Sequence, residues 1–247
     1  MVKIRVLSLL ITLLLLNCTK ETIRQGLPSD ELFKLSKEYY DRKKYGTAID
    51  GFKRLIFEHP GSEYIDDAQF YLGDSYLQTH DYENAAVEFR FCIQNFPESP
   101  YLDDAHYKLG VTYYKASPAY YLDQRRTHEA VKVIDRFITR FPESELIEEA
   151  KGIKEKCFDK LSKKGLENGK LYCKSGHYKS AKIYFDDIIE QYPSSSHIEE
   201  ARFMLALCYI KLGREEEAKE IFEELAASSG TFSKKAEKEL TKLNKRE

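Results

Sequence analysis

The nine residues Pro-Gly-Ser-Glu-Tyr-Ile-Asp-Asp-Ala at positions 60–68 belong to a phrase that the chain repeats four times. The shared pattern is Pro-x-Ser-x-x-(Ile/Leu)-acid-acid-Ala, and its copies occupy residues 60–68, 97–105, 142–150 and 193–201. Because proline cannot continue a helix, we expect it to end the preceding helix, and we expect the serine to cap the next. The paired carboxylates then lie near the positive end of that helix. The repeated phrase therefore predicts a stack of helical hairpins.

A second set of positions has the same period. An alanine lies 12 residues before each of these prolines and a large apolar residue lies eight before it, and a fifth unit ends at Gly230. These pairs are Ala48/Phe52, Ala85/Phe89, Ala130/Ile134, Ala181/Phe185 and Ala218/Phe222. The pattern resembles the tetratricopeptide repeat, which the second unit matches best through Leu72, Gly73, Tyr76, Ala85, Phe89 and Pro97. We predict an all-α solenoid of about five such hairpins with a C-terminal capping helix, in which small residues allow close helix approach and aromatic residues fill the core.

The third unit is eight residues longer than the second between its glycine and its alanine. The extra residues lie around 116–124 and predict a projecting loop. Loops on repeat scaffolds often carry contacts, which makes Tyr120, Tyr121, Asp123 and Gln124 candidate partner contacts. A tolerated insertion explains the same spacing equally well.

Gly169 lies 27 residues after Pro142, whereas Gly73 lies 13 residues after Pro60, so this segment is 14 residues longer. The additional length equals almost four helical turns, so we predict one long helix from Leu146 to about Lys174. The predicted organisation is a leader at 1–17, a tether at 18–29, repeats one to three at 30–142, the long helix with repeats four and five at 143–232, and a capping helix at 233–247.

The N-terminus has the features of an export signal. Lys3 and Arg5 precede an apolar run at 6–16, which is shorter than the roughly 20 residues that a membrane span needs. The run ends at Asn17-Cys18 and resembles a bacterial lipoprotein signal, in which Cys18 would carry the lipid. Asn17 departs from the small residue usual before that cysteine, so an ordinary signal peptide with an incidental cysteine is the alternative.

Composition and motifs give no indication of catalysis. The 247 residues are 42% hydrophobic and 32% charged with a formal net charge of −2, which gives no electrostatic reason to expect nucleic acid. We find no phosphate loop, nucleophile elbow or metal-ligand spacing, and we predict no cofactor and no metal. The six histidines, at 59, 80, 106, 128, 177 and 197, are predicted to be surface and turn residues. Cys92, Cys157, Cys173 and Cys208 are predicted to be small buried thiols, with pairing between different helices left open.

A binding surface is the better candidate. In tetratricopeptide-like stacks the first helix of each hairpin lines the concave face, and its ligand-facing positions correspond here to Phe33, Lys37, Tyr40, Phe70, Asp74, Leu77, Tyr107 and Tyr114. Most of these residues are aromatic or aliphatic, which suits an extended peptide or a partner's exposed strand. The alternative is that some of the rings pack between hairpins.

The leader, the hairpins, the insertion at 121–124 and the stretches 134–138 and 141–144 together resemble the BamD family of outer-membrane assembly lipoproteins. The resemblance implies a non-enzymatic subunit of the β-barrel assembly machinery, anchored by lipid alone to the periplasmic face of the outer membrane. It also implies three kinds of partner: the periplasmic domains of the central barrel subunit, bound through about Leu166 to Leu225; other assembly lipoproteins; and unfolded outer-membrane proteins, received by Leu32 to Phe96.

Two alternatives stay open. A periplasmic coordinator of the Tol-Pal type has similar Phe-Pro-x-Ser and Leu-Gly repeats, but members usually carry a coiled coil before the repeats and lack a lipid cysteine. An exported hydrolase or metal enzyme would need a clustered His, Asp and Glu site in the fold.

Overall fold

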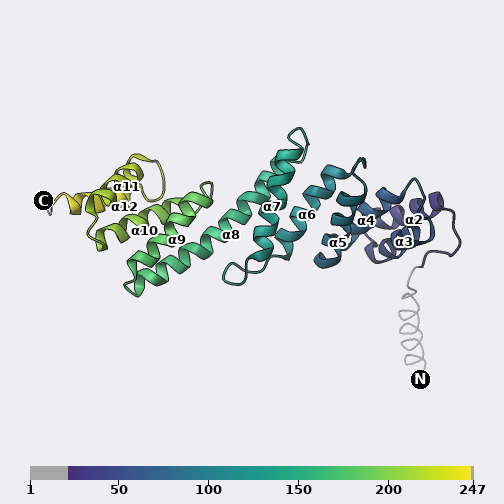
Figure 1. The fold of residues 1–247 in the computed structure, drawn as a ribbon, viewed down its shortest axis with the longest axis horizontal. Coiled ribbons are helices and arrows are strands. Elements are labelled where there is room, and N and C mark those ends of the chain that lie inside the picture. The colour runs from purple at the N-terminus through teal and green to yellow at the C-terminus, as the bar shows by residue number, and fades with distance from the viewer. Residues whose placement is uncertain (1–21, 246–247) are drawn as a thin grey trace, which may run out of the picture. The chain divides into compact units, whose positions relative to one another are not determined.

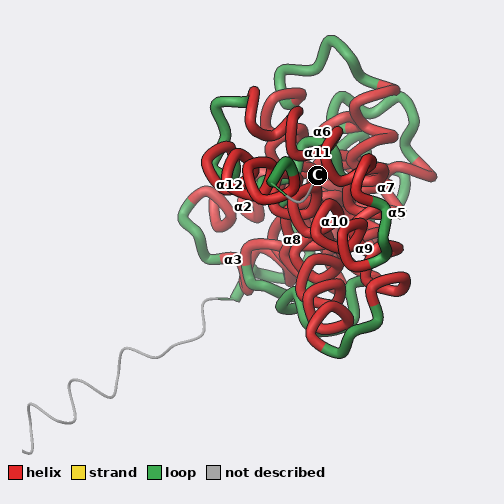
Figure 2. Tube along the Cα trace, turned by 90° about the vertical axis from the view of Figure 1, so that its left-hand side faces the viewer, coloured by secondary structure: helices red, strands yellow, loops and turns green. Residues whose placement is uncertain are grey.

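The computed structural model describes residues 22–245, so the predicted leader and Cys18 lie outside the described residues. Eleven α-helices and no strands occur in the described part of the chain (Figures 1 and 2). Their bounds are α2 Ser29–Asp41, α3 Tyr45–Glu58, α4 Ile65–Gln78, α5 Tyr82–Asn95, α6 Leu102–Ala116, α7 Arg125–Arg140, α8 Ile147–Lys174, α9 Tyr178–Gln191, α10 Ile198–Lys211, α11 Glu215–Ala227 and α12 Ser233–Leu243. The all-α prediction is confirmed.

Consecutive helices pair as hairpins within two compact units that divide after Leu102. The first unit holds the hairpins α2/α3 and α4/α5 (Figure 1). The second holds α8/α9 and α10/α11, with α12 packed on α11, and α6/α7, in which Tyr107 and Gly110 lie against Phe137 and Ile134. The division falls inside the predicted group of three N-terminal repeats at 30–142, so that grouping stays a prediction.

The prolines of the repeated phrase end helices as predicted. The four preceding helices stop two residues before each proline, at Glu58, Asn95, Arg140 and Gln191. The residue in between leaves the helical region each time, with φ from −125° to −132° and ψ from 54° to 62°. A following proline disfavours helical backbone at this residue, which explains why four separate turns share one geometry.

The predicted role of the serines was wrong in detail. Each serine Oγ accepts a hydrogen bond from the N–H two residues later, at 3.1–3.3 Å, and that residue lies just before the helix. Ser62, for example, bonds Tyr64 N, whereas α4 begins at Ile65. The serine is too far ahead of the helix to reach its first-turn N–H groups, so it closes the turn instead of capping the helix.

The predicted core positions are confirmed. The alanine and the large apolar residue of all five units have no solvent exposure. The glycine of the first helix faces that large residue, because a Cβ built on Gly73, Gly110 or Gly169 would lie 3.0, 2.4 or 2.5 Å from Phe89, Ile134 or Phe185. At Gly110 and Gly169 a side chain would force the neighbouring residue to shift, and at Gly73 it would make a tight contact, so the close helix approach favours glycine at all three positions. The tyrosine position is less regular: Tyr76 is 7% exposed, but Tyr172, which lies equally far before the alanine of the fourth unit, is 36% exposed.

The long helix predicted from Leu146 to about Lys174 is α8, and the predicted insertion is the α6–α7 loop at 117–124. At the C-terminal end, Ala236 and Leu243 of α12 pack in one cluster with Phe222 of α11. Within residues 22–245, no helix combines the length and the apolar composition that crossing a membrane requires.

Candidate binding surfaces

The α6–α7 loop lies against α8, held by three lysines of that helix. Lys160 Nζ donates to Ser117 Oγ at 2.5 Å, and Lys164 Nζ donates to the Leu122 carbonyl at 2.7 Å. Lys163 Nζ lies 4.7 Å from the ring centroid of Tyr120, within the range of a cation–π contact. The two spacing departures in the sequence, the long loop and the long helix, therefore pack against each other. We predicted a projecting loop, and the structure shows that contacts with α8 hold this loop in place.

Gln124 organises this loop from inside. Its side chain is 4% exposed, and Nε2 donates to the carbonyls of Ala119 at 2.8 Å and Leu122 at 3.2 Å. Its Oε1 accepts from Thr127 Oγ1 at 2.7 Å. These bonds use both N–H donors of the amide, and the side chain is buried, so a partner could contact Gln124 only if the loop opened. The burial favours a shaping role for Gln124 over the predicted partner contact.

Asp123 marks the start of α7. Its carboxylate accepts hydrogen bonds from the Arg125 backbone N–H at 3.0 Å and from Arg125 Nε at 2.6 Å. The backbone bond and then the guanidinium lower the pKa of this exposed carboxyl. Asp123 is accessible to a partner, but its charge is already paired.

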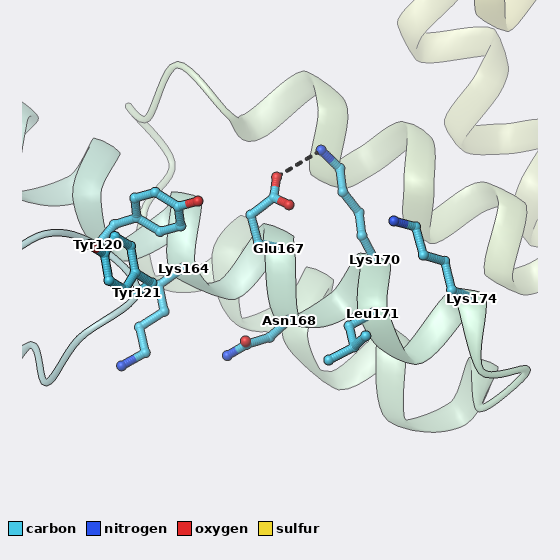
Figure 3. A pocket seen from close by; sticks show the side chains of 8 residues that line it. All are labelled: Tyr120, Tyr121, Lys164, Glu167, Asn168, Lys170, Leu171 and Lys174. Carbon is cyan, nitrogen blue, oxygen red and sulfur yellow. Dashed lines mark hydrogen bonds and ion pairs between the residues drawn. The ribbon is translucent and has the colours of Figure 1, made fainter.

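A shallow pocket with a volume of about 320 Å³ lies beside the loop (Figure 3). Tyr120 and Tyr121 lie at one end, and six residues of α8 continue the row: Lys164, Glu167, Asn168, Lys170, Leu171 and Lys174. Together with Leu122 and Lys163 we call these residues the loop–α8 surface. Three of its apolar side chains face solvent, with Tyr121 68%, Leu122 49% and Leu171 62% exposed. Exposed apolar side chains gathered in one place are typical of interaction sites.

The charge of the loop–α8 surface is positive. Lys170 is neutralised by Glu167 at 3.2 Å and by Glu200 at 2.6 Å. Among the described residues, Lys163, Lys164 and Lys174 have no carboxylate within ion-pairing distance. Such a surface fits a partner segment that combines acidic and apolar side chains. The sequence prediction included the tyrosines but missed Leu171 and Lys174, because the helical pattern alone did not indicate that the loop would lie beside them.

In the first unit, three predicted groove residues lie in a partly exposed aromatic cluster. The Phe33 ring stacks on Tyr64 with centroids 5.0 Å apart, and the Tyr40 ring lies 5.0 Å from Tyr71. Lys37 Nζ lies 4.9 Å from the Tyr71 centroid and pairs with the Asp41 carboxylate at 2.5 Å. We call Phe33, Lys37 and Tyr40 the α2 patch, because all three belong to α2 and are half-buried.

The three candidates of α4 are buried. Phe70, Asp74 and Leu77 are 6%, 1% and 2% exposed, and Phe70 stacks on Tyr101 with centroids 4.6 Å apart. Asp74 accepts a hydrogen bond from the Tyr40 hydroxyl, and burial followed by this bond raises the pKa of Tyr40. The structure favours the packing alternative for Phe70, Asp74 and Leu77, so ligand contact in this unit is a prediction for the α2 patch alone.

Tyr107 and Tyr114 belong to α6 in the second unit. The Tyr107 ring lies 5.9 Å from Phe137, and Lys160 Nζ lies 5.1 Å from the Tyr114 centroid. Burial raises the pKa of both tyrosines. Both side chains are half-buried, and their contact with a ligand remains a prediction.

One histidine contradicts the prediction of surface and turn positions. His106 lies in α6 and is 9% exposed, with its ring 5.3 Å from Phe141 and its Nε2 3.4 Å from Arg140 Nη1. Burial, and then the positive charge of Arg140, lowers its pKa to about 4. It directly follows the buried alanine of the repeated phrase, which places it at the edge of the core stripe. Within the described residues, no three His, Cys, Asp or Glu side chains cluster as metal ligands.

The cysteines follow the prediction in three cases. Cys92, Cys157 and Cys208 are buried, whereas Cys173 is half-buried. Burial raises the pKa of the Cys92 and Cys157 thiols to about 12, which leaves them protonated and unreactive.

Consecutive helical hairpins with this register of buried alanines and large apolar residues define a helical-repeat protein of the tetratricopeptide type. The sequence model of the family described as "YfiO: Outer membrane lipoprotein" matches residues 25–245. The chain therefore belongs to this family, and the predicted family resemblance is confirmed.

Two relatives carry the name "Outer membrane protein assembly factor BamD". The protein of Caulobacter vibrioides is 32% identical over 97 residues, which cover 39% of this chain and 32% of that relative. The protein of Rickettsia prowazekii is 26% identical over 179 residues, which cover 72% of this chain and 71% of the relative. The match thus spans about a third of the first relative's length and most of the second's.

Solved structures with a similar arrangement include a thermophilic TPR protein of Thermus thermophilus. It is 17% identical, with 80% of this chain and 89% of that chain covered and a TM-score of 0.39. The P58(IPK) TPR domain is 13% identical, with 79% and 50% covered and a TM-score of 0.45.

Proposed function

We propose that this chain is a non-catalytic scaffold of outer-membrane protein assembly and that its loop–α8 surface binds the periplasmic domains of the central barrel subunit. The names of the two relatives support the general role. The location of the site rests on one observation: exposed Tyr121, Leu122 and Leu171 lie among lysines that lack carboxylate partners. The partner segment should present acidic side chains around an apolar centre.

The loop–α8 surface is also preorganised. The bonds from Lys160, Lys164 and Gln124 fix the loop before any partner arrives. Binding therefore loses less conformational entropy than it would with a flexible loop, and more of the energy from burying Tyr121 and Leu171 goes into affinity. Tyrosine is among the residues that most often dominate the energy of an interface.

Affinity capture from detergent-solubilised membranes tests this proposal. The double variant Tyr121→Ala/Leu171→Ala should recover at least about tenfold less central barrel subunit than the unsubstituted chain, because each truncation of an interface anchor costs about 1–2 kcal/mol. Phe57→Ala is the matched control, since Phe57 is 87% exposed and belongs to α3 of the first unit. Equal recovery with the double variant and the control would reject this site.

The proposal gives the first unit a separate task, the reception of unfolded outer-membrane proteins by the α2 patch. Phe33 and Tyr40 are half-buried, and the Lys37 ammonium lies above the Tyr71 ring, so an extended apolar segment could pack along α2. A peptide copied from an outer-membrane β-strand should bind less tightly to Lys37→Glu than to Lys34→Glu, a control on an exposed residue of the same helix. The same affinity for both variants would remove the α2 patch from the proposal.

We further propose that lipid on Cys18 anchors the chain to the periplasmic face of the outer membrane and that other assembly lipoproteins accompany it there. Several acyl chains on one cysteine suffice for stable anchoring, because each buried methylene contributes about 0.8 kcal/mol. Cells fed labelled palmitate should label the unsubstituted chain and not Cys18→Ser. A Tol-Pal coordinator would instead stay unlabelled and would recover no barrel subunit.

A further inference from the structure

Two cysteines of different helices meet in the second unit. Cys173 lies in the last turn of α8 and Cys208 lies in α10, and their Sγ atoms are 3.4 Å apart. Both belong to the cluster around Phe185, in which Cys208 has no solvent exposure and Cys173 is packed at the edge. Thiols 35 residues apart in sequence are here in van der Waals contact. A small approach of the two side chains brings them to the roughly 2.05 Å of a disulfide bond.

We propose that Cys173 and Cys208 form a disulfide that joins the end of α8 to α10. In cells this inference rests on the proposed export of the chain, because disulfides persist in oxidising compartments such as the bacterial periplasm. The oxidant is a disulfide donor, either a protein dithiol oxidase or a small-molecule disulfide.

The two thiols differ in access, which sets the order of steps. Half-buried Cys173 meets the donor first: its thiolate attacks one donor sulfur, a mixed disulfide forms, and the other donor sulfur leaves as a thiolate. Cys208 then gives up its proton and attacks Cys173 Sγ, and the second donor sulfur leaves. Two thiols have lost two protons and two electrons, and the donor disulfide has become two thiols. Burial raises the pKa of Cys208, which makes the second step the slower one.

The bond would complete a connection that the structure already begins. Lys170, one turn before Cys173, pairs with Glu200 of α10 at 2.6 Å. The part of α8 that carries Leu171 and Lys174 of the loop–α8 surface would then be tied to α10 by an ion pair and a covalent bond. Reduction would leave only the ion pair.

Peptide mapping of the purified full chain tests the inference without any partner. After treatment with oxidised glutathione and alkylation of free thiols, trypsin should release the peptides 171–174 and 203–211 as one species, about 2 Da lighter than their sum. Cys92 and Cys157 should be alkylated once the chain is unfolded. Separate recovery of the two peptides with alkylated cysteines would overturn the proposal, and so would a glutathione adduct on Cys173 that Cys208 fails to displace.

Thermal unfolding gives a second readout with matched controls. Oxidation should raise Tm by about 5 °C or more in the unsubstituted chain and in Cys157→Ala, because the bond closes a loop of 35 residues. Cys173→Ser should show no such shift. If the chain captures no central barrel subunit but the two peptides are linked, the proposed function is wrong and the disulfide is supported. If the chain captures the central barrel subunit but the peptides are separate, the disulfide is wrong and the proposed function is supported.

Discussion

Substituting two glycines of α8 tests the close helix approach on which the repeat fold depends. A Cβ on Gly169 would lie 2.5 Å from Cε1 and 2.7 Å from Cζ of Phe185, whereas a Cβ on Gly152 meets no atom within 4 Å. Carbon atoms pack at about 3.5–4.0 Å, so Gly169→Ala requires the ring to retreat by about 1 Å. Phe185 has no solvent exposure and packs against Leu166, Ile188 and Leu205, so the ring cannot retreat freely.

Both variants place alanine inside α8, but only Gly169→Ala creates this overlap. Replacing glycine by alanine inside a helix gains about 1 kcal/mol, and overpacking a core costs about 1–3 kcal/mol. Gly152→Ala should therefore raise the free energy of unfolding by about 1 kcal/mol. The free energy of unfolding of Gly169→Ala should be about 1–3 kcal/mol lower than that of Gly152→Ala, because only Gly169→Ala overpacks the core. The gain in helix propensity is the same in both variants and cancels in the comparison.

Urea unfolding followed by circular dichroism measures both free energies, provided that the slope with denaturant stays constant. A chain of two compact units can unfold in two steps, and the step that belongs to residues 103–247 is then the one to compare. Equal stabilisation by both substitutions would show that α8 and α9 do not approach closely at Gly169, contrary to the structure.

The remaining predictions concern single groups. His106 has a pKa of about 4 in the folded chain against 6.5 in the unfolded chain, so its contribution to stability is complete above pH 6.5 and is lost as the pH falls towards 4. This loss, roughly 1–3 kcal/mol in the free energy of unfolding, should be absent in His106→Gln. If the free energy of unfolding of that variant depended on pH as it does in the unsubstituted chain, the buried position of His106 would not be the cause. Gln124→Ala leaves the carbonyls of Ala119 and Leu122 without their donor, so amide hydrogen exchange should become faster across 117–124. Asp123→Ala, at an exposed neighbouring position, should increase the exchange rate less. Binding of the central barrel subunit should weaken as salt rises, and Lys174→Gln should reduce that salt dependence whereas Lys211→Gln, on α10, should not.

The repeat pattern predicted the backbone framework because its residues act locally. Each proline stops a helix through its own ring, and each buried alanine and large apolar residue occupies a position that the helical period fixes. The length of α8 followed from the same arithmetic, since 14 extra residues preserve the helix face. Features that depend on one or two turns of chain were therefore predictable.

Features that depend on contacts between distant segments could not be predicted from the sequence. The sequence predicted a projecting loop around 116–124, but three lysines about 40 residues later hold that loop against α8. The burial of Gln124 and the addition of Leu171 to the loop–α8 surface both follow from this contact. The serines show a similar limit at shorter range, because an extra turn between Ser62 and Ile65 moves the hydroxyl out of reach of the helix.

Photocrosslinking in intact membranes tests the central claim, that the loop–α8 surface is where the central barrel subunit docks. A photoreactive residue replaces Tyr121 in one chain and Phe57 in another, since both side chains are exposed but belong to different units. We expect a crosslink to the central barrel subunit from position 121 and none from position 57. No such crosslink from position 121, with the chain folded and present at normal levels, would contradict it.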